Sequence, residues 1–225
     1  MSETYKAIEV TRPGVFTEVD RPLQDPGPDQ VRIRIEACGV CHTDSMLVNQ
    51  ELPGLTYPRV PGHEIVGRID AIGANVRTRS VGQHVGVGIS GGRDGTCIAC
   101  LRGDFVNCAN PVLTGITVDG GYAEVMTIEA DATVTIPEGL QSVNAAPLLC
   151  AGVTTFNALR NAGLRAGSLV AIQGVGGLGH LGIQYARRMG FRTVAIGLGP
   201  ESEKLAIVLV PDALNGSRAG KRPKT

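Results

Sequence analysis

"SLVAIQGVGGLGHLGIQYARRMGFRTVAIG", residues 168–197, is the stretch that decides the fold class of the second half of this chain. An apolar run that predicts a strand leads into a glycine-rich turn. A run that predicts a helix follows, and then a second strand-like run, "RTVAIG". The turn "GVGGLG" fits G-x-G-x-x-G between a strand and a helix, where glycines permit a tight turn and close approach to a pyrophosphate. The pattern predicts the start of a doubly wound dinucleotide-binding domain, although an ordinary glycine-rich turn would read similarly. The candidate cofactor-binding glycines are Gly174, Gly176, Gly177 and Gly179.

The sequence before this domain has a different composition. Short β-like runs such as "VRIRIEA", "EIVGRIDAIG" and "YAEVMTI" alternate with loops rich in Gly and Pro. This pattern is typical of a small barrel-like β domain with few helices. We therefore expect a first domain over residues 1–153 and a second over residues 154–210.

Overall composition limits the possible partners. The chain has 225 residues, 43% of them hydrophobic, with 21 basic and 21 acidic side chains. A sizeable core is possible, and the zero formal net charge does not favour nucleic acid or anionic lipid as a partner. Neither an apolar leader nor a run of about eighteen apolar residues is present. We expect a soluble, cytoplasmic protein without a membrane partner.

The stretch "ACGVCHTD", residues 37–44, allows three interpretations: a c-type haem attachment site, a C-x-x-C redox pair, or part of a zinc site. The haem interpretation is disfavoured because such proteins are normally exported. A redox pair is expected at the start of a helix in a βαβ unit, and the flanking sequence, "QVRIRIEACGV" followed by "TDSMLV", differs from that context.

A second group of cysteines lies in "DGTCIACLRGDFVNC", residues 94–108. Asp94, Cys97, Cys100 and Cys108 follow the spacing D-x2-C-x2-C-x7-C. Closely spaced ligands on one loop are typical of a structural zinc site. Free thiols or a disulfide are the alternatives, and a disulfide is disfavoured in a reducing cytosol.

Together these motifs resemble a known family. Cys41 in "GVCHTD", His63 in "PGHEIVGRIDAIGANV", the cysteine-rich lobe at about 90–110, Cys150 in "PLLCAGVTT" and the "GVGGLG" turn occur in the order found in zinc-dependent alcohol dehydrogenases of the medium-chain dehydrogenase/reductase superfamily. Residues 62–76 match G-H-E-x2-G-x5-G-x2-V without a gap. The resemblance covers about residues 5–205. It implies a GroES-like β-barrel catalytic domain followed by the first part of a Rossmann domain, C-terminally truncated.

The resemblance also implies roles for individual residues. Cys41, His63 and Cys150 correspond to the ligands of a catalytic zinc whose fourth position is left for water or substrate, and Cys38 to a buried thiol. Asp94, Cys97, Cys100 and Cys108 correspond to the ligands of a structural zinc, so two zinc ions per chain are expected. The implied reaction is hydride transfer between NAD(P) and a small-molecule alcohol, aldehyde or ketone.

The neighbouring residues take their implied roles from the same resemblance. Thr43 matches the hydroxyl that contacts the alcohol and begins a proton relay, and Asp44 and Glu64 match acidic residues that orient the ligands. His42 matches a basic position near the cofactor pyrophosphate, with a solvated loop residue as the alternative. His84 and His180 are expected to be structural.

Three departures from the family pattern affect these expectations. Met46 stands where many relatives end the proton relay with a histidine. Ile89 stands where many carry Trp or Phe in the substrate pocket, which predicts a wider pocket. Gly197 replaces the acid that selects NAD, and although Leu198 is no phosphate-binding arginine, the change favours NADP slightly over NAD. Lys204 is the nearest cation.

The family pattern ends after "SEKLA". Residues 211–225 contain four basic side chains and no acid after Asp212, which predicts a disordered basic tail and a truncation or a shifted reading frame. Turnover is then expected to be impaired, and the homo-oligomer usual in the family is not expected. A noncatalytic zinc-binding remnant is the alternative. Zinc-free quinone reductase chemistry is disfavoured because all three catalytic ligands are present.

Overall fold

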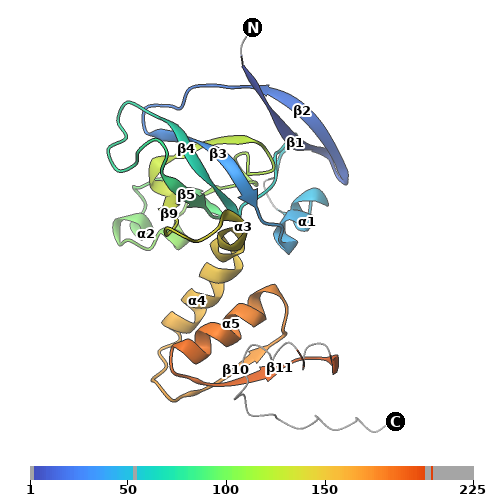
Figure 1. Cartoon of the computed structure of the whole chain (residues 1–225), viewed down its shortest axis with the longest axis vertical. Helices are drawn as coiled ribbons and strands as arrows, with labels where there is room; N and C mark the ends of the chain where they lie inside the picture. The colour runs from blue at the N-terminus through green and yellow to red at the C-terminus, as the bar shows by residue number, and fades with distance from the viewer. Residues whose placement is uncertain (1–2, 53–54, 201–203, 205–225) are drawn as a thin grey trace. The chain divides into compact units, whose positions relative to one another are not determined.

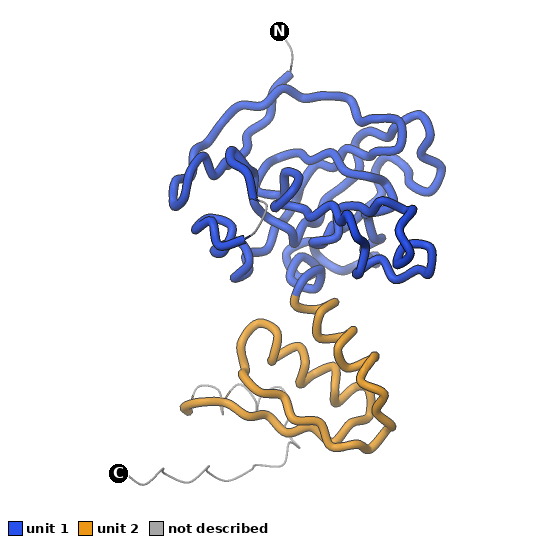
Figure 2. Tube along the Cα trace, turned by 180° about the vertical axis from the view of Figure 1, so that it is seen from behind, with its two compact units in different colours: residues 1–150 blue, residues 151–225 orange. Residues whose placement is uncertain are grey.

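The computed structural model describes residues 3–52, 55–200 and 204, and the chain divides into two compact units, residues 1–150 and 151–225 (Figure 2). A division after residue 153, as placed from the sequence, would lie inside helix α4, Ala151–Asn161. The predicted tail at residues 211–225 lies outside the described residues. Within the described ranges, no helix is both long and apolar enough to cross a bilayer.

A five-stranded antiparallel sheet forms the centre of the first unit (Figure 1). Its order is β8-β3-β4-β5-β9, comprising Val125–Glu129, Gln30–Cys38, Ile65–Ile72, His84–Val87 and Thr133–Thr135. β3 buries the alternate residues Val31 and Ile33 on one face of the sheet, and Ile65 of β4 and Val85 of β5 belong to the same apolar cluster. Burial of this face accounts for the period-two pattern in the sequence, because successive strand residues point to opposite sides.

Shorter elements surround this sheet. β1, Thr4–Arg12, pairs with β2, Val15–Pro22, and β6, Ser90–Gly92, pairs with β7, Val112–Leu113. The helices are α1, His42–Val48; α2, Ile98–Leu101; and α3, Ser142–Ala145. Three 3-10 helices are η1, Phe105–Asn107; η2, Ala130–Ala132; and η3, Ala146–Leu149. The unit is rich in β-structure with short helices, as the sequence predicts.

In the described part of the second unit, a strand–helix–strand crossover follows α4. β10, Leu169–Gln173, leads into α5, Gly177–Arg188, and then into β11, Arg192–Ile196, which lies parallel to β10. The rings of Phe156 on α4 and Tyr185 on α5 meet edge to face with centroids 5.9 Å apart. Leu159, Val170 and Ala186 form the buried centre of this unit. The crossover predicted from residues 168–197 is therefore confirmed.

Candidate active site and metal centres

Cys41 caps the N-terminus of α1. Cys41 Sγ accepts from the Thr43 backbone N–H at 3.3 Å, and the Cys41 backbone N–H donates to Asp44 Oδ2 at 2.9 Å. This reciprocal capping satisfies helix N–H groups that have no partner within the helix. The sequence argument that this flank differs from a helix start is therefore wrong, because a helix does begin behind the cysteine.

The redox interpretation still does not fit this site. The strand before Cys41 is β3 of an antiparallel sheet and not part of a βαβ unit. Burial raises the pKa of the Cys38 thiol to about 12, whereas redox-active C-x-x-C pairs have a lowered thiol pKa. Cys38 is thus a partly buried thiol, its sulfur 3.6 Å from the carbonyl oxygen of Gly39.

Four potential ligands converge at the sheet end near Cys41. His63 and Glu64 immediately precede β4, and Cys150 follows η3. One ligand atom from each of Cys41, His63, Glu64 and Cys150 lies within 4.8 Å of all the others. Cys41 Sγ is 3.2 Å from His63 Nε2 and 3.9 Å from Cys150 Sγ. The fold brings together the three residues that the resemblance implies as zinc ligands, and it adds the Glu64 carboxylate.

Asp44 fixes the orientation of the His63 ring. Asp44 Oδ1 lies 3.3 Å from His63 Nδ1 and accepts from the Gly62 N–H at 3.2 Å. Burial acts to raise the pKa of Asp44, but the hydrogen bonds from His63 and the backbone outweigh it, and the pKa is lowered. Burial acts to lower the pKa of His63, but Asp44 outweighs it, and that pKa is raised. With Nδ1 directed at Asp44, Nε2 faces Cys41 and is available as a ligand.

The remaining groups of the cluster are also electrostatically linked. Burial raises the pKa of the Cys150 thiol to about 12, and the negative charge of Cys41 adds to this effect. Burial likewise raises the pKa of Glu64. For Cys41, burial is outweighed by hydrogen bonds from Thr43 and the charge of His63, and its pKa is lowered. Two sulfurs, an imidazole and a carboxylate at this spacing fit a zinc ion, which would favour the deprotonated form of each acid.

Two features near the cluster were missed in the sequence reasoning. A side chain at Gly39 would overlap the Glu64 carboxylate, so the close approach of these segments requires glycine. The Tyr122 ring lies against Gly62, which has a φ of +98°. The C-G-V-C spacing could have drawn attention to Gly39. We find no sequence pattern that singles out Tyr122.

The cysteine-rich lobe forms a second cluster. One ligand atom from each of Asp94, Cys97, Cys100 and Cys108 lies within 4.8 Å of the others, and all six cysteines are free thiols. Asp94 Oδ1 accepts from the backbone N–H groups of Thr96 and Cys97, both at 2.9 Å. These bonds, and one from the Asn110 side chain to Oδ2, hold the pKa of Asp94 well below its usual range. This anionic loop fits a tetrahedral divalent ion.

The glycine turn has the geometry that an anion site requires. Gly174 has a φ of +84°, and a side chain at Gly179 would overlap the Gly174 carbonyl oxygen. Gly176 caps α5, and both it and Gly177 have open space above them. The N-terminus of a twelve-residue helix is therefore accessible to a pyrophosphate.

The remaining site residues singled out from the sequence lie on or near α1, except Gly197 at the end of β11. Thr43 is half-buried beside Cys41, His42 is exposed at the start of α1, and Gly197 directly follows β11. Met46 is half-buried on α1, and Ile89 packs on an apolar cluster that includes Leu47.

The two remaining histidines take part in local hydrogen bonds. His84 Nε2 lies 3.0 Å from the Ser142 hydroxyl and 3.5 Å from a Glu36 carboxylate oxygen. His180 Nδ1 lies 3.1 Å from the Gly176 carbonyl oxygen.

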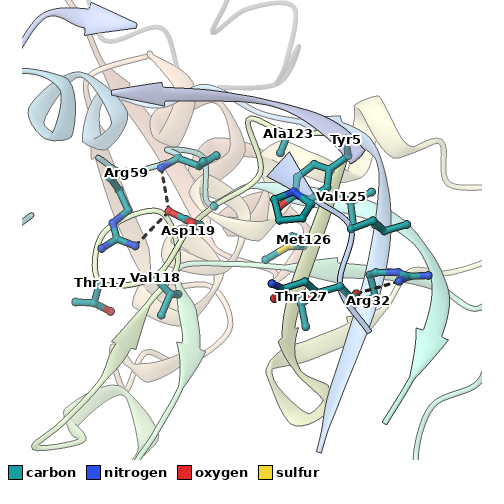
Figure 3. Close-up of a pocket in the computed structure, with 15 residues that line it drawn as sticks. Tyr5, Arg32, Arg59, Thr117, Val118, Asp119, Ala123, Val125, Met126 and Thr127 are labelled. Atoms are coloured by element: carbon teal, nitrogen blue, oxygen red, sulfur yellow. Dashed lines mark hydrogen bonds and ion pairs between the residues drawn. The ribbon is translucent and has the colours of Figure 1, made fainter. Parts of the chain in front are cut away.

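A cavity of about 380 Å³ lies elsewhere in the first unit (Figure 3). Tyr5, Arg32, Arg59, Asp119 and Met126 are among its lining residues. None of the predicted site residues lines it.

Comparisons with known proteins agree with this description. Residues 27–138 match the alcohol dehydrogenase GroES-like domain. The chain is 47% identical over 221 residues to alcohol dehydrogenase notN of Aspergillus sp. (strain MF297-2), covering 98% of this chain and 65% of that protein.

Two solved structures show the same fold. The CAD of Helicobacter pylori complexed with NADP(H) is 27% identical with a TM-score of 0.85, covering 93% of this chain and 63% of its own. The cobalt- and zinc-bound thermostable alcohol dehydrogenase of Pyrobaculum aerophilum is 28% identical with a TM-score of 0.83. The match covers 92% of this chain and 63% of that protein's chain.

Residues 27–138 thus correspond to a GroES-like domain of the alcohol dehydrogenase type, and nearly the whole chain is similar to proteins named alcohol dehydrogenases. The chain combines a GroES-like unit with a Rossmann-like unit. It spans less than two thirds of the length of the relatives described above.

Proposed function

We propose that this chain provides the metal site and the pyrophosphate-binding turn of an alcohol oxidoreductase. The proposed reaction transfers a hydride between NAD(P) and a small-molecule alcohol, aldehyde or ketone. The observation that carries the proposal is the convergence of Cys41, His63, Glu64 and Cys150, with Asp44 directly behind His63. The similarity of nearly the whole chain to proteins named alcohol dehydrogenases supports it.

The donor set indicates which residues hold the metal. Cys41 and Cys150 supply thiolates, and His63 supplies Nε2. A zinc ion would act here as a Lewis acid that lowers the pKa of an alcohol or polarises a carbonyl group. Asp44 maintains the His63 tautomer, and Glu64 supplies a fourth potential ligand within reach. We assign the second ion, a structural zinc, to Asp94, Cys97, Cys100 and Cys108.

Proton transfer is assigned to Thr43. The Thr43 backbone N–H donates to the sulfur of the ligand Cys41 at 3.3 Å, and the Thr43 hydroxyl can both accept and donate a proton. Met46 has no titratable group, so a proton accepted by Thr43 would have to leave to water or, with a cofactor bound, to its ribose. His42, exposed at the start of the same helix, provides a basic group for the cofactor phosphates.

The glycine turn is assigned to the cofactor pyrophosphate. Gly174, Gly176, Gly177 and Gly179 leave the α5 N-terminus accessible to the anion. Gly197 contributes no carboxylate that would repel a 2′-phosphate, which favours NADP over NAD. The solved Helicobacter pylori relative is an NADP(H) complex, in line with this preference. We further propose a cytoplasmic location, with a small alcohol or carbonyl compound as the partner and no role for nucleic acid.

Two measurements test this proposal. Elemental analysis of the purified chain should give two zinc ions per chain. The double variant Cys41→Ser, His63→Asn should retain one zinc ion per chain. Hydride transfer is then followed at 340 nm with NAD and NADP across primary and secondary alcohols. Two bound zinc ions without turnover would support the noncatalytic zinc-binding alternative, and absence of zinc would refute both.

A further inference from the structure

The hydroxyl of Tyr122 is fully buried and has no hydrogen-bond partner in the structure. Only two other side-chain polar atoms within the described residues share this property, Arg59 Nε and Thr114 Oγ1. Leaving a buried hydroxyl without a partner costs about 1–3 kcal/mol. Phenylalanine would fill the same space without that cost, so the hydroxyl requires an explanation.

The Tyr122 ring is held beside the metal cluster. A side chain built at Gly62 would lie 2.7 Å from Tyr122 Cδ1, so the ring lies directly on Gly62. The Tyr122 N–H donates to the Pro61 carbonyl at 3.0 Å, and the Tyr122 carbonyl accepts from Ile8 at 2.8 Å. Tyr122 is thus anchored on both sides, and its ring lies on Gly62, the residue that precedes His63.

Asp44 contacts the same residue as the Tyr122 ring, because Asp44 Oδ1 accepts from the Gly62 N–H at 3.2 Å and the ring lies on Gly62. Burial raises the pKa of Tyr122, and the negative charge of Asp44 is the next largest cause. Asp44 Oδ1 already interacts with Gly62 N and His63 Nδ1, while Oδ2 accepts from Cys41 N. A carboxylate offers about four lone-pair sites, so Oδ2 can accept one further hydrogen bond.

We propose that Tyr122 is a positioning residue of the metal site. Its hydroxyl donates to the Asp44 carboxylate when Cys41, His63 and Cys150 hold a metal ion, and this bond keeps Asp44 against His63 Nδ1. The inference rests on the proposed function. It explains why a tyrosine lies where only an apolar ring is needed for packing.

The test is Tyr122→Phe in the full, zinc-loaded chain. Zinc release to a chromophoric chelator should show about tenfold weaker binding at the site of Cys41, His63 and Cys150, because residues behind the ligands typically contribute 10–100-fold in affinity. Release from the lobe of Asp94 should be unchanged and serves as an internal control. Tyr185→Phe in the second unit is the matched variant and should match the wild type at both sites.

A second readout separates positioning from packing. The chain has four histidines, so ¹⁵N-histidine labelling gives a small set of ring signals. The Nδ1–H signal of His63 should shift in Tyr122→Phe while the other three remain in place. A double-mutant cycle of Tyr122→Phe with Asp44→Asn measures the coupling of the two side chains in zinc affinity, and zero coupling would overturn the role.

The outcomes distinguish the two proposals. If the wild-type chain holds no zinc at Cys41, His63 and Cys150, the proposed function fails. If the wild type holds zinc and Tyr122→Phe holds it with equal affinity and an unchanged His63 signal, only the role of Tyr122 fails. If Cys38→Ala abolishes the effect of Tyr122→Phe, the hydroxyl donates to Cys38, and the assignment to Asp44 is refuted.

Discussion

Asp44 and His63 form a buried charge pair beside Cys41, with His63 Nδ1 and Asp44 Oδ1 3.3 Å apart. Asp44 is 4% exposed and His63 is 1% exposed. The Asp44 carboxylate is bonded to three groups: two backbone N–H donors and the imidazole. Such a pair costs desolvation energy and is kept only where its partners are well placed. Removing one partner is therefore expected to destabilise the fold in a pH-dependent way.

We predict that Asp44→Asn destabilises the metal-free chain most at about pH 5.5. The folded pKa of Asp44 is lowered, so its contribution is present above the unfolded value near 4 and is lost as pH falls through the folded pKa. The folded pKa of His63 is raised, so its contribution is present below about 6.5 and is lost as pH rises through the folded pKa. Urea unfolding with chelator at pH 3, 5.5 and 8 measures the difference. An equal loss in the free energy of unfolding at all three pH values would contradict a charge interaction between Asp44 and His63.

At the scale of elements, the lobe between β6 and β7 depends on one acidic side chain. α2 and η1 together bury few apolar side chains, and Ile98, Leu101 and Val106 are exposed. Asp94 instead ties the loop through its bonds to Thr96, Cys97 and Asn110. Asp94 therefore has two separable roles, as an acceptor that orders the loop and as a charged metal ligand.

Asp94→Asn and Asp94→Ala separate these roles. Asparagine keeps an oxygen acceptor for the two backbone N–H groups but loses the charge, whereas alanine loses both. We expect both variants to release the lobe zinc more readily, and Asp94→Ala to melt at a lower temperature than Asp94→Asn by the loss of a cap worth about 1 kcal/mol. Zinc content and thermal unfolding are measured together. Unchanged zinc content in both variants would remove Asp94 from the ligand set.

The β10–α5 turn gives a second element-scale prediction. Gly179→Ala places a side chain against the Gly174 carbonyl and should cost about 1–3 kcal/mol by overpacking. Gly177→Ala enters open space at the first position of α5 and should be neutral or stabilising by up to about 1 kcal/mol. Urea unfolding of both variants tests this contrast. Equal stability of the two variants would show that the helix does not pack against the turn as described.

At the scale of the whole molecule, the two units and the lobe draw on different sources of stability. The five-stranded sheet is held by a cluster that includes Val31, Ile33, Ile69 and Val87. The second unit has its own apolar centre around Leu159 and Ala186. The lobe and the ligand cluster instead hold acidic groups close together, which a metal ion would stabilise.

Metal removal should therefore loosen the molecule unevenly. After chelation, amide hydrogen exchange should rise in residues 93–110 and 38–44, and it should stay slow in β3, β4 and the β10–α5–β11 crossover. Exchange measured by mass spectrometry on zinc-loaded and chelated chain provides the comparison, and re-addition of zinc is the control. A uniform rise across both units would show that the metal stabilises the entire chain.

The crossover of the second unit and the lobe could be predicted from the sequence because both depend on local patterns. "GVGGLG" between two apolar runs specifies its own turn, since only glycine adopts the Gly174 conformation readily and fits at Gly179. The four lobe residues lie within one short loop, so their spacing alone indicates that they bind one metal ion. The start of α1 was missed because a cysteine is an uncommon N-cap.

The convergence of the active site was decided by tertiary structure. The resemblance implied Cys41, His63 and Cys150, but the pairing of β3 with β4 and the path of η3 bring their side chains together. Tyr122 lies against Gly62 only because the loop before β8 folds back onto that residue. Sequence periodicity records which face of a strand is buried, whereas contacts between distant segments depend on strand register and loop path. For that reason the residue types of the site could be expected from the sequence, and the placement of Glu64 and Tyr122 could not.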